Sequence, residues 1–294
     1  MTPFLPSRID KVKFRGRSFY IKRDDLIDPC LSGNKYRKLY TLMQTPSNAY
    51  KKVISYGGGQ SNAMLSIACL CKSKGWEYHY YTKTLPSYLK KGLEGNLEQA
   101  IGLGMIVHEV SHENYEAQVK LLQALEEEGT LVISQGGADE IASKGVEVLA
   151  NEINLWKKEK NLAKLIVVLP SGTGSTSLYL KAFLNKDIEL YTVVLVGDEA
   201  FQLEQWKRLS NGPYPKILPS AKKKFAKPYD EYLEIYQELK SETKIEFDLI
   251  YAPKTWIQIT EQLFESESEI LYIHTGGVSG NHTMLERYKH KGRR

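Results

Sequence analysis

The sequence has few cysteines and no long apolar segment, and both shortages limit what the protein can be. Its cysteines, Cys30, Cys69 and Cys71, are odd in number and predict no disulfide framework, which favours a reducing cytoplasm. Cys69 and Cys71 lie two apart in an expected helix, so their side chains point in different directions and are not expected to share a metal ion. No apolar run reaches the ~18 residues that cross a bilayer, and no basic-then-apolar signal peptide begins the sequence, so neither a membrane span nor secretion is expected.

The sequence also lacks a strong charge of either sign. Its 40 basic and 35 acidic residues give a net charge of +5, spread along 294 residues. The basic runs 222–224 and 289–294 are short and typical of solvated surface, so no nucleic-acid partner is expected. His108 and His112 are four apart, but they fall in an expected strand end and loop, which argues against zinc. Length and composition are those of an ordinary globular protein with one large domain or two smaller ones.

What the sequence does contain is a regular alternation of strands and helices. The expected strands are 12–14, 18–22, 52–56, 77–82, 105–110, 131–133, 165–169, 190–196, 247–251 and 270–274. The expected helices are 35–43, 61–74, 87–99, 116–128, 139–160, 175–184, 199–209, 229–242, 255–265 and 281–289. This order predicts an α/β fold with parallel sheets wrapped by helices, in two lobes. Ligands in such folds bind beyond the carboxyl ends of the strands, so the loops that follow each strand are the candidate sites.

Lys35 stands out because it lies in the first turn of an expected helix. Gly33 breaks regular structure ahead of it, Ser32 and Asn34 can cap a helix, and an apolar stripe begins at Leu39. The positive end of a helix dipole disfavours a cation and lowers the pKa of an amine, as a nucleophilic lysine requires. The plainer interpretation is a solvated lysine at a frayed helix start.

A loop of small and hydroxyl residues follows the most continuously apolar strand, 165–169. The loop reads Ser171-Gly172-Thr173-Gly174-Ser175-Thr176 and precedes an expected helix. Converging backbone N–H groups, the helix dipole and the hydroxyls favour a phosphate site. No Gly-Lys-Ser/Thr follows as in a Walker loop, and Ser177 stands where a dinucleotide fingerprint has its third glycine. The alternative is a tight strand-to-helix turn.

Two further loops follow strands. The first, Gly57-Gly58-Gly59-Gln60-Ser61-Asn62-Ala63, begins a helix whose free N–H groups suit a carboxylate, and Asn62 can bond a hydroxyl or an oxyanion. A glycine-rich turn with Ser61 or Asn62 as a plain N-cap explains it equally well. The second, His274-Thr275-Gly276-Gly277, permits the close approach of a planar ligand, whereas His274 by itself is expected to pack within the strand.

A lysine at a helix start, a phosphate site and a carboxylate site together fit one cofactor, pyridoxal 5′-phosphate. The sequence resembles the 1-aminocyclopropane-1-carboxylate deaminase and D-cysteine desulfhydrase family over nearly its whole length, and least over residues 205–245. The matching motifs, in the family's order, are Lys22-Arg23-Asp24-Asp25, Ser32-Gly33-Asn34-Lys35-x-Arg37-Lys38-Leu39, Gln60-Ser61-Asn62, Thr173-Gly174-Ser175-Thr176 and His274-x-Gly276-Gly277.

The resemblance implies the tryptophan-synthase-β-like fold, fold type II, with the cofactor in a cleft between two lobes. The large domain would comprise residues 1–42 and 133–294, and the small domain residues 43–132. The resemblance further implies a homodimer that acts on a small amino acid.

The resemblance also implies a role for each matched residue. Lys35 would form the Schiff base with the cofactor and then act as the base at Cα. Asn62 would face the cofactor's 3′-hydroxyl, and Ser61 with the neighbouring Ala63 would hold the substrate carboxylate.

The loop Ser171 to Thr176 would hold the cofactor's phosphate, and Thr275 would lie beside the cofactor. Tyr251 matches a tyrosine that stacks near the substrate. A second family tyrosine is matched here by Tyr229, with Phe225 as the alternative, because the spacing in this region departs from that of the family.

Two departures from the family bear on the substrate. Deaminases of the family carry a glutamate directly after the tyrosine matched by Tyr251, where this sequence has Ala252; they carry leucine where it has Thr275. A glutamate beside the pyridine nitrogen keeps that nitrogen protonated and makes the ring a deep electron sink, which Ala252 cannot do. The sequence therefore favours β-elimination on D-cysteine or a similar β-substituted amino acid, with 1-aminocyclopropane-1-carboxylate deamination as the alternative.

Two other functions remain as competitors. A protein of this fold can keep the cofactor in a regulatory role, although the presence of Lys35 argues against it. A dehydrogenase built on Gly172-x-Gly174 with Asp187 or Glu189 leaves Lys35 unexplained.

Overall fold

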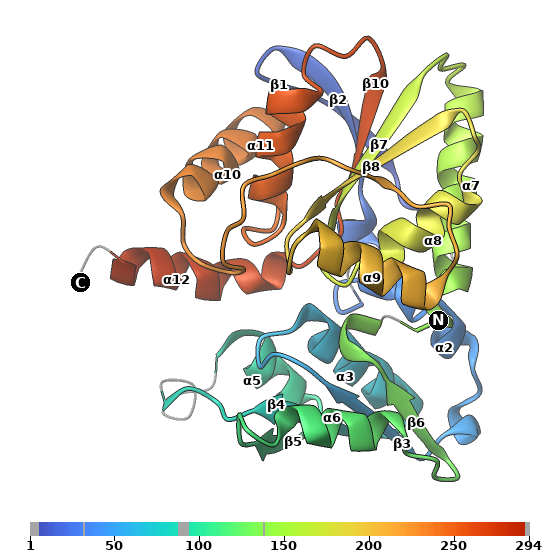
Figure 1. The fold of residues 1–294 in the computed structure, drawn as a ribbon, viewed down its shortest axis with the longest axis vertical. Helices are drawn as coiled ribbons and strands as arrows, with labels where there is room; N and C mark the ends of the chain where they lie inside the picture. Colours follow the sequence, from blue (N-terminus) through green and yellow to red (C-terminus); the bar gives the residue numbers. More distant parts are fainter. Residues whose placement is uncertain (1–5, 32, 88–93, 138, 292–294) are drawn as a thin grey trace.

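The computed structural model describes residues 6–31, 33–87, 94–137 and 139–291. These residues form two lobes, one above the other in Figure 1, each built on its own β-sheet. Both sheets are parallel except at one hairpin, so the predicted α/β fold with mostly parallel sheets is confirmed. Every helix in the described part of the chain is too short or too polar to cross a lipid bilayer.

The larger sheet forms the upper lobe. Its strands run in the order β1 (Ile9–Phe14), β2 (Arg17–Lys22), β10 (Glu269–Ile273), β7 (Leu165–Ser171), β8 (Ile188–Val194) and β9 (Lys216–Ile217). Only β1 and β2 pair antiparallel. Strand β7 lies at the centre and is buried at every position, as expected for a strand covered on both faces.

Helices cover both faces of the larger sheet. One face packs against α7 (Ala142–Glu159) and α8 (Ser175–Phe183), and the other against α10 (Asp230–Thr243) and α11 (Ala252–Gln262). The fully buried Trp256 of α11 fills the centre of the second face.

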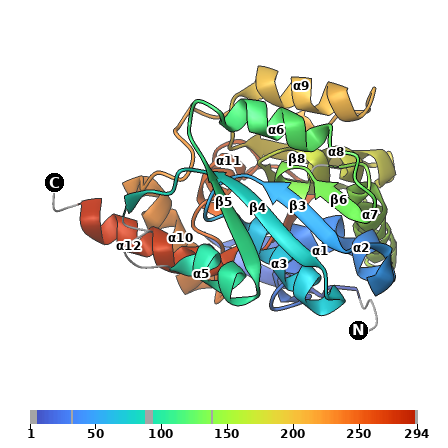
Figure 2. The ribbon, with the colours of Figure 1, turned by 90° about the horizontal axis from the view of Figure 1, so that it is seen from below.

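The smaller sheet forms the lower lobe. Its strands run in the order β5 (Met105–Val110), β4 (Glu77–Lys83), β3 (Lys52–Tyr56) and β6 (Thr130–Ile133). One face packs against α3 (Asn62–Lys74) and α5 (Gly95–Gly102), the other against α6 (Tyr115–Gln123), as the view from below shows (Figure 2). The division into domains at residues 43 and 132 stays a prediction.

The remaining helices join or flank the lobes. They are α1 (Asn34–Lys38), α2 (Tyr40–Gln44), α9 (Glu199–Leu209) and α12 (Asn281–Lys291), with 3-10 turns at Asp24–Leu26, Ser47–Ala49, Gln135–Gly137 and Val278–Gly280. Leu39, at φ −92° and ψ 4°, breaks the helix predicted over residues 35–43 into α1 and α2. Ser32 and residues 88–93, the latter inside the helix predicted over 87–99, lie outside the described residues.

The strand predicted over residues 247–251 is wrong, because side chains replace the strand pairing there. The Asn281 side chain accepts from the N–H of Leu249 at 2.8 Å and donates to the carbonyl of Phe247 at 2.9 Å. The carboxylate of Asp248 accepts from the N–H groups of Ile250 and Tyr251. The segment therefore forms a turn that leads into α11, which an apolar sequence alone does not reveal.

The expectation of no disulfide is also wrong. Cys30 and Cys69 are bonded to each other, with their Cα atoms 6.1 Å apart, within the usual range for a disulfide. The bond joins the segment before Lys35 to helix α3. Cys71, two residues along that helix, is a free and buried thiol. An odd count left one cysteine over but did not prevent the other two from pairing.

Candidate active site

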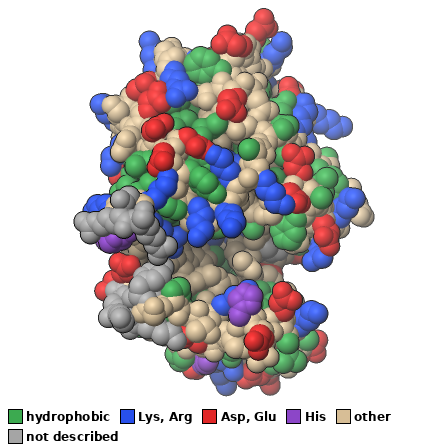
Figure 3. Space-filling model, turned by 60° about the vertical axis from the view of Figure 1, so that its left-hand side comes forward, with side chains coloured by type: hydrophobic (Ala, Val, Ile, Leu, Met, Phe, Trp, Pro, Cys, Tyr) green, Lys and Arg blue, Asp and Glu red, His purple; other side chains and the backbone are tan. Residues whose placement is uncertain are grey.

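The predicted site residues gather where the two lobes face each other. Strands β7 and β10 of the larger sheet and β3 of the smaller sheet all end at this boundary, followed by the loops at 171–174, 274–277 and 57–61. The space-filling view shows the molecule hollowed between its lobes (Figure 3). The cleft is therefore bordered by the three loops that the sequence analysis singled out.

Lys35 lies in the first turn of α1, which is fastened to the loop after β10. Gly33 precedes the helix at φ +64°, and the N–H of Asn34 donates to the carbonyl oxygen of Thr275 at 3.1 Å. The Lys35 amine donates to the side-chain oxygen of Asn34 at 3.2 Å. Burial lowers the pKa of Lys35 to about 8. The shift has the predicted direction, and desolvation of the charged amine causes it.

A buried ion-pair network holds α1 against α7. Arg37, 2% exposed, donates to both carboxylate oxygens of Asp24 at 2.9 and 3.0 Å and to both of Glu152 at 2.7 and 2.8 Å. Lys22 also donates to Glu152, at 2.6 Å. Such two-pronged pairs fix orientation as well as position, so the helix that carries Lys35 is rigidly placed.

The loop between β7 and α8 has the features of an anion site. Gly174 has φ +80° and caps α8, and the hydroxyl of Ser175 is buried without a hydrogen-bond partner among the described residues. The side chain of Asn34 donates to the hydroxyl of Thr176 at 3.4 Å, which links Lys35's neighbour to this loop. Ser171 differs from the rest, because its hydroxyl bonds those of Ser177 and Thr192 inside the lobe.

Lys38 is a site residue that the sequence analysis missed. Its side chain is 3% exposed, and its amine donates to the carbonyl of Gly136 at 2.9 Å and to the hydroxyl of Thr173 at 3.4 Å. Burial, and then the charge of Lys35, place its pKa well below the usual value. A buried amine bonded only to neutral acceptors favours a nearby anion. Its spacing of three from Lys35, on one face of a helix, was the signal that could have identified it.

The start of α3 brings Ser61, Asn62 and Ala63 to the cleft. The Ser61 hydroxyl oxygen caps the helix, accepting from the N–H groups of Ala63 at 3.2 Å and Met64 at 3.4 Å, and the hydroxyl can also donate. The Asn62 oxygen accepts from Asn96 at 2.8 Å. Its nitrogen lies so close to Gly277 that a Cβ there would be 2.5 Å away.

Tyr251 lies against Gly172 in the loop between β7 and α8. Its ring would contact a Cβ on Gly172 at 3.5 Å, and burial raises the pKa of its hydroxyl. Phe225 stands edge-on to it, with ring centroids 5.3 Å apart. Tyr229 instead packs on Tyr232, and its hydroxyl bonds the backbone of Lys224. Of the two candidates for the second aromatic residue, Phe225 is the one in contact with Tyr251.

The loop after β10 contacts α1 through the backbone carbonyl of Thr275, whereas the side chain of His274 points into the larger lobe. His274 is fully buried, stacks on Phe247 and bonds the carbonyl of Glu246 at 2.9 Å, which is the packing role expected for it. Within the described part of the chain, no group of three or more histidine, cysteine or acidic side chains is arranged to hold a metal ion.

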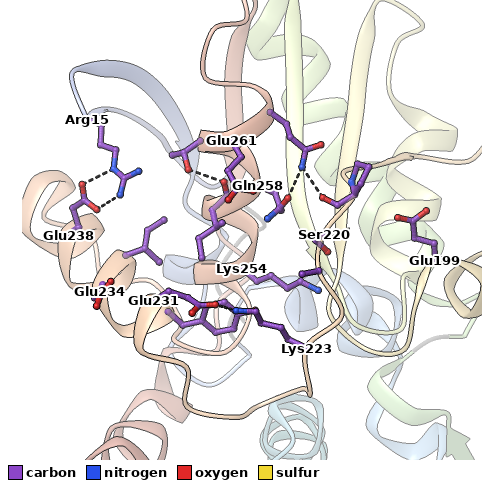
Figure 4. A pocket seen from close by; sticks show the side chains of 17 residues that line it. Arg15, Glu199, Ser220, Lys223, Glu231, Glu234, Glu238, Lys254, Gln258 and Glu261 are labelled. Carbon is purple, nitrogen blue, oxygen red and sulfur yellow. Dashed lines mark hydrogen bonds and ion pairs between the residues drawn. The ribbon is translucent and has the colours of Figure 1, made fainter.

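A separate cavity of about 880 Å³ lies on the larger lobe (Figure 4). Residues of α10, α11 and segment 219–223 line it, and two ion pairs lie among them, Arg15 with Glu238 and Lys223 with Glu231. None of the predicted site residues borders it, so it is distinct from the cleft.

The sequence is similar to that of a described family and of several known proteins. The family described as pyridoxal-phosphate dependent enzyme matches residues 1–225. A Thermotoga maritima protein, assigned provisionally as a 1-aminocyclopropane-1-carboxylate deaminase, is 30% identical over 291 residues, or 90% of each chain. A mitochondrial Arabidopsis thaliana protein named as a bifunctional D-cysteine desulfhydrase and 1-aminocyclopropane-1-carboxylate deaminase is 27% identical over 301 residues, which cover 92% of this chain and 75% of that protein.

Solved structures show the same fold. The crystal structure of a homologue of 1-aminocyclopropane-1-carboxylate deaminase has a TM-score of 0.79 at 23% identity, covering 97% of this chain and 94% of that one. The predicted fold type II architecture is therefore confirmed.

Proposed function

Because this chain belongs to the family of pyridoxal-phosphate dependent enzymes, we propose that it catalyses β-elimination on D-cysteine or a similar β-substituted amino acid. Its cofactor is pyridoxal 5′-phosphate. The observation that carries the proposal is the amine of Lys35, whose pKa is lowered to about 8. The residue before it, Asn34, donates a hydrogen bond to Thr176 at the start of α8.

The residues present fit this cofactor. Gly174, Ser175 and Thr176 would hold the phosphate, together with the buried amine of Lys38, and the unsatisfied Ser175 hydroxyl is a donor without another use among the described residues. When bound, the cofactor supplies an electron-withdrawing ring that makes the Cα hydrogen of an amino-acid substrate acidic.

Lys35 serves as the base in this reaction. A pKa of about 8 leaves a useful fraction of its amine neutral near pH 7, so it can take the proton from Cα. The Cβ–S bond then breaks and the thiolate leaves. Overall, D-cysteine and water give pyruvate, ammonia and hydrogen sulfide.

Ser61 and Tyr251 orient the substrate. The Ser61 hydroxyl, at the positive end of α3, can donate to a carboxylate. Tyr251 and Phe225 form an aromatic wall against Gly172, which limits the size of the substrate side chain.

Ala252 is the reason for preferring β-elimination to deamination of the cyclopropane amino acid. Its side chain is fully buried and has no group to hold a proton on the pyridine nitrogen, where deaminases of the family carry a glutamate. The thiolate of D-cysteine leaves readily and makes a modest demand on the ring, whereas opening a cyclopropane without a Cα hydrogen makes a greater one. Conversion of 1-aminocyclopropane-1-carboxylate to 2-oxobutanoate and ammonia is the alternative, supported by the names of the relatives.

A direct assay distinguishes these activities. The purified protein is incubated separately with D-cysteine, L-cysteine and 1-aminocyclopropane-1-carboxylate, and sulfide, pyruvate and 2-oxobutanoate are measured. We expect sulfide and pyruvate from D-cysteine in equal amounts. Rapid formation of 2-oxobutanoate without sulfide from either cysteine would overturn the proposed substrate.

A lysine variant separates the active site from general effects. Lys35→Ala is expected to abolish activity and the visible absorption of the bound cofactor, whereas Lys72→Ala, which changes an exposed lysine of α3, retains both. A wild-type protein that stays colourless with added cofactor would contradict the central claim.

The assembly and cellular location belong to the same proposal. We infer a homodimer from the resemblance to the family, and light scattering of the purified protein tests it. A cytoplasmic location rests on the low cysteine content, and the Cys30–Cys69 bond counts against it. The oxidation state of these two cysteines in freshly lysed cells decides the matter.

A further inference from the structure

The carbonyl oxygen of Gly174, at the turn of the loop before α8, accepts three hydrogen bonds. The N–H of Leu178 donates to it at 3.0 Å as part of the helix, and the hydroxyl of Ser177 donates at 2.8 Å. The third donor, at 3.0 Å, is the indole Nε1 of Trp206, which comes from α9, about 30 residues further along the chain. This carbonyl is therefore held from behind by another helix.

A second side chain of α9 acts on the preceding carbonyl. The amide nitrogen of Gln202, 1% exposed, donates to the carbonyl oxygen of Thr173 at 3.4 Å. A Cβ at Gly174 would lie 1.8 Å from this nitrogen and 2.6 Å from the indole nitrogen of Trp206. Helix α9 thus fills the space behind Gly174.

Trp206 has little freedom to move. Its side chain is fully buried, and its ring stacks on Tyr214 with centroids 5.9 Å apart and planes 15° from parallel. The indole N–H is a donor only, with one direction fixed by the ring. Its position is therefore set by the packing of α9 and not by the loop it contacts.

Holding these carbonyls matters because a peptide plane can present either its N–H or its C=O to an anion. A loop that binds phosphate must turn its N–H groups inward, and any carbonyl that turned inward would repel the phosphate. Donors placed behind the loop stabilise the orientation in which the carbonyls point away. Neither Trp206 nor Gln202 needs to touch the phosphate to have this effect.

We propose that Trp206 and Gln202 are positioning residues of the phosphate site. They fix the Thr173–Gly174 and Gly174–Ser175 peptide planes with the N–H groups of Gly174 and Ser175 toward the cofactor. The inference rests on the proposed cofactor site. It predicts that affinity for the phosphorylated cofactor depends on the indole N–H and not only on the bulk of the ring.

The test compares two buried tryptophans, one whose indole N–H donates a hydrogen bond and one whose indole N–H donates none within the described part of the chain. Trp206→Phe removes the donor and keeps an aromatic ring, and Trp256→Phe is the matched control, because Trp256 is also fully buried but its N–H has no partner among the described residues. Gln202→Met is the second variant, which removes the other donor at similar volume. The probe is pyridoxamine 5′-phosphate, which binds without forming a bond to Lys35, and calorimetry measures its dissociation constant.

We expect Trp206→Phe and Gln202→Met each to weaken pyridoxamine 5′-phosphate binding by about fivefold, the effect of one lost hydrogen bond. Trp256→Phe is expected to bind as wild type does. The phosphorus NMR resonance of the bound ligand should shift in the first two variants and not in the control, a readout that a change in stability alone does not move.

Two outcomes would overturn the inference. Binding by both α9 variants as tight as by wild type would show that the indole and amide donors do not position the loop. Equal losses in Trp206→Phe and Trp256→Phe would show that aromatic packing, not the hydrogen bond, is responsible. Failure of the wild-type protein to bind the probe would instead contradict the cofactor site itself.

Discussion

The backbone N–H of Asn34 donates to the carbonyl oxygen of Thr275 at 3.1 Å, and this bond joins two segments 241 residues apart in sequence. It fastens the first turn of the lysine helix to the loop that follows β10. Gly33 makes the approach possible, because a Cβ there would lie only 1.8 Å from the same carbonyl oxygen. The position of Lys35 therefore depends on the absence of a side chain two residues earlier.

Gly33→Ala is expected to lower the free energy of unfolding by at least about 2 kcal/mol and to weaken cofactor binding. The added methyl group cannot occupy the position of the Thr275 oxygen, and Gly33 has φ +64° and ψ −137°, a conformation that only glycine adopts readily. Urea unfolding and cofactor titration measure the two effects.

Gly75→Ala is the control for the backbone part of this effect. Gly75 also has a positive φ, +72°, but a Cβ there meets no atom within 4 Å. We expect a loss of about 1 kcal/mol in stability and unchanged cofactor affinity. Equal behaviour of the two variants would show that the contact with Thr275 is unimportant.

The rate of cofactor uptake by the apoprotein should rise with pH up to about pH 8. The lowered pKa of Lys35, caused by burial, makes its amine the neutral nucleophile above about pH 8, instead of above the ordinary lysine pKa of 10.5. The rate is expected to increase about tenfold per pH unit below this value and then level off. Stopped-flow recording of the visible band gives the profile, and a midpoint near 10.5 would show that the amine is fully solvated.

Asp248→Asn tests the buried carboxyl in the turn before α11. Burial raises the pKa of Asp248 to about 6 from 3.8, so between these values the folded protein binds more protons than the unfolded chain, and its stability falls as pH rises. Asparagine keeps an acceptor for the N–H groups of Ile250 and Tyr251 but does not titrate. We therefore expect the variant to gain up to about 3 kcal/mol relative to wild type between pH 4 and pH 7. A difference in unfolding free energy that does not change with pH would contradict the raised pKa.

Reduction of the Cys30–Cys69 bond should lower stability. The bond closes a loop with a sequence separation of 39, and the entropy of such a loop corresponds to about 4 kcal/mol. We expect one titratable thiol in the unreduced, denatured protein and three after reduction. Reductant should lower the melting temperature of Cys71→Ala, as it does for wild type, but not that of Cys30→Ala. Three titratable thiols without reductant would show that the bond does not form.

The sequence by itself determined the α/β fold and the segments that border the cleft. Apolar strands followed by glycine-rich loops and helices are local patterns, and backbone N–H groups at helix starts are anion sites in any context. The family motifs around Lys35, Asn62 and Gly174 gave the cofactor, because each motif depends on residue types at short and fixed spacing.

Only the tertiary structure decided which groups surround these motifs. Three contacts join segments far apart in sequence, so no local pattern contains them. They are the disulfide between Cys30 and Cys69, the ring contact between Phe225 and Tyr251, and the hydrogen bond from Trp206 to Gly174. The segment 247–251 is apolar enough for a strand. Its backbone groups at Phe247 and Leu249 instead form hydrogen bonds with the side chain of Asn281, more than 30 residues further along the chain. The low pKa of Lys35 likewise comes from burial, and burial depends on how the two lobes and α1 pack.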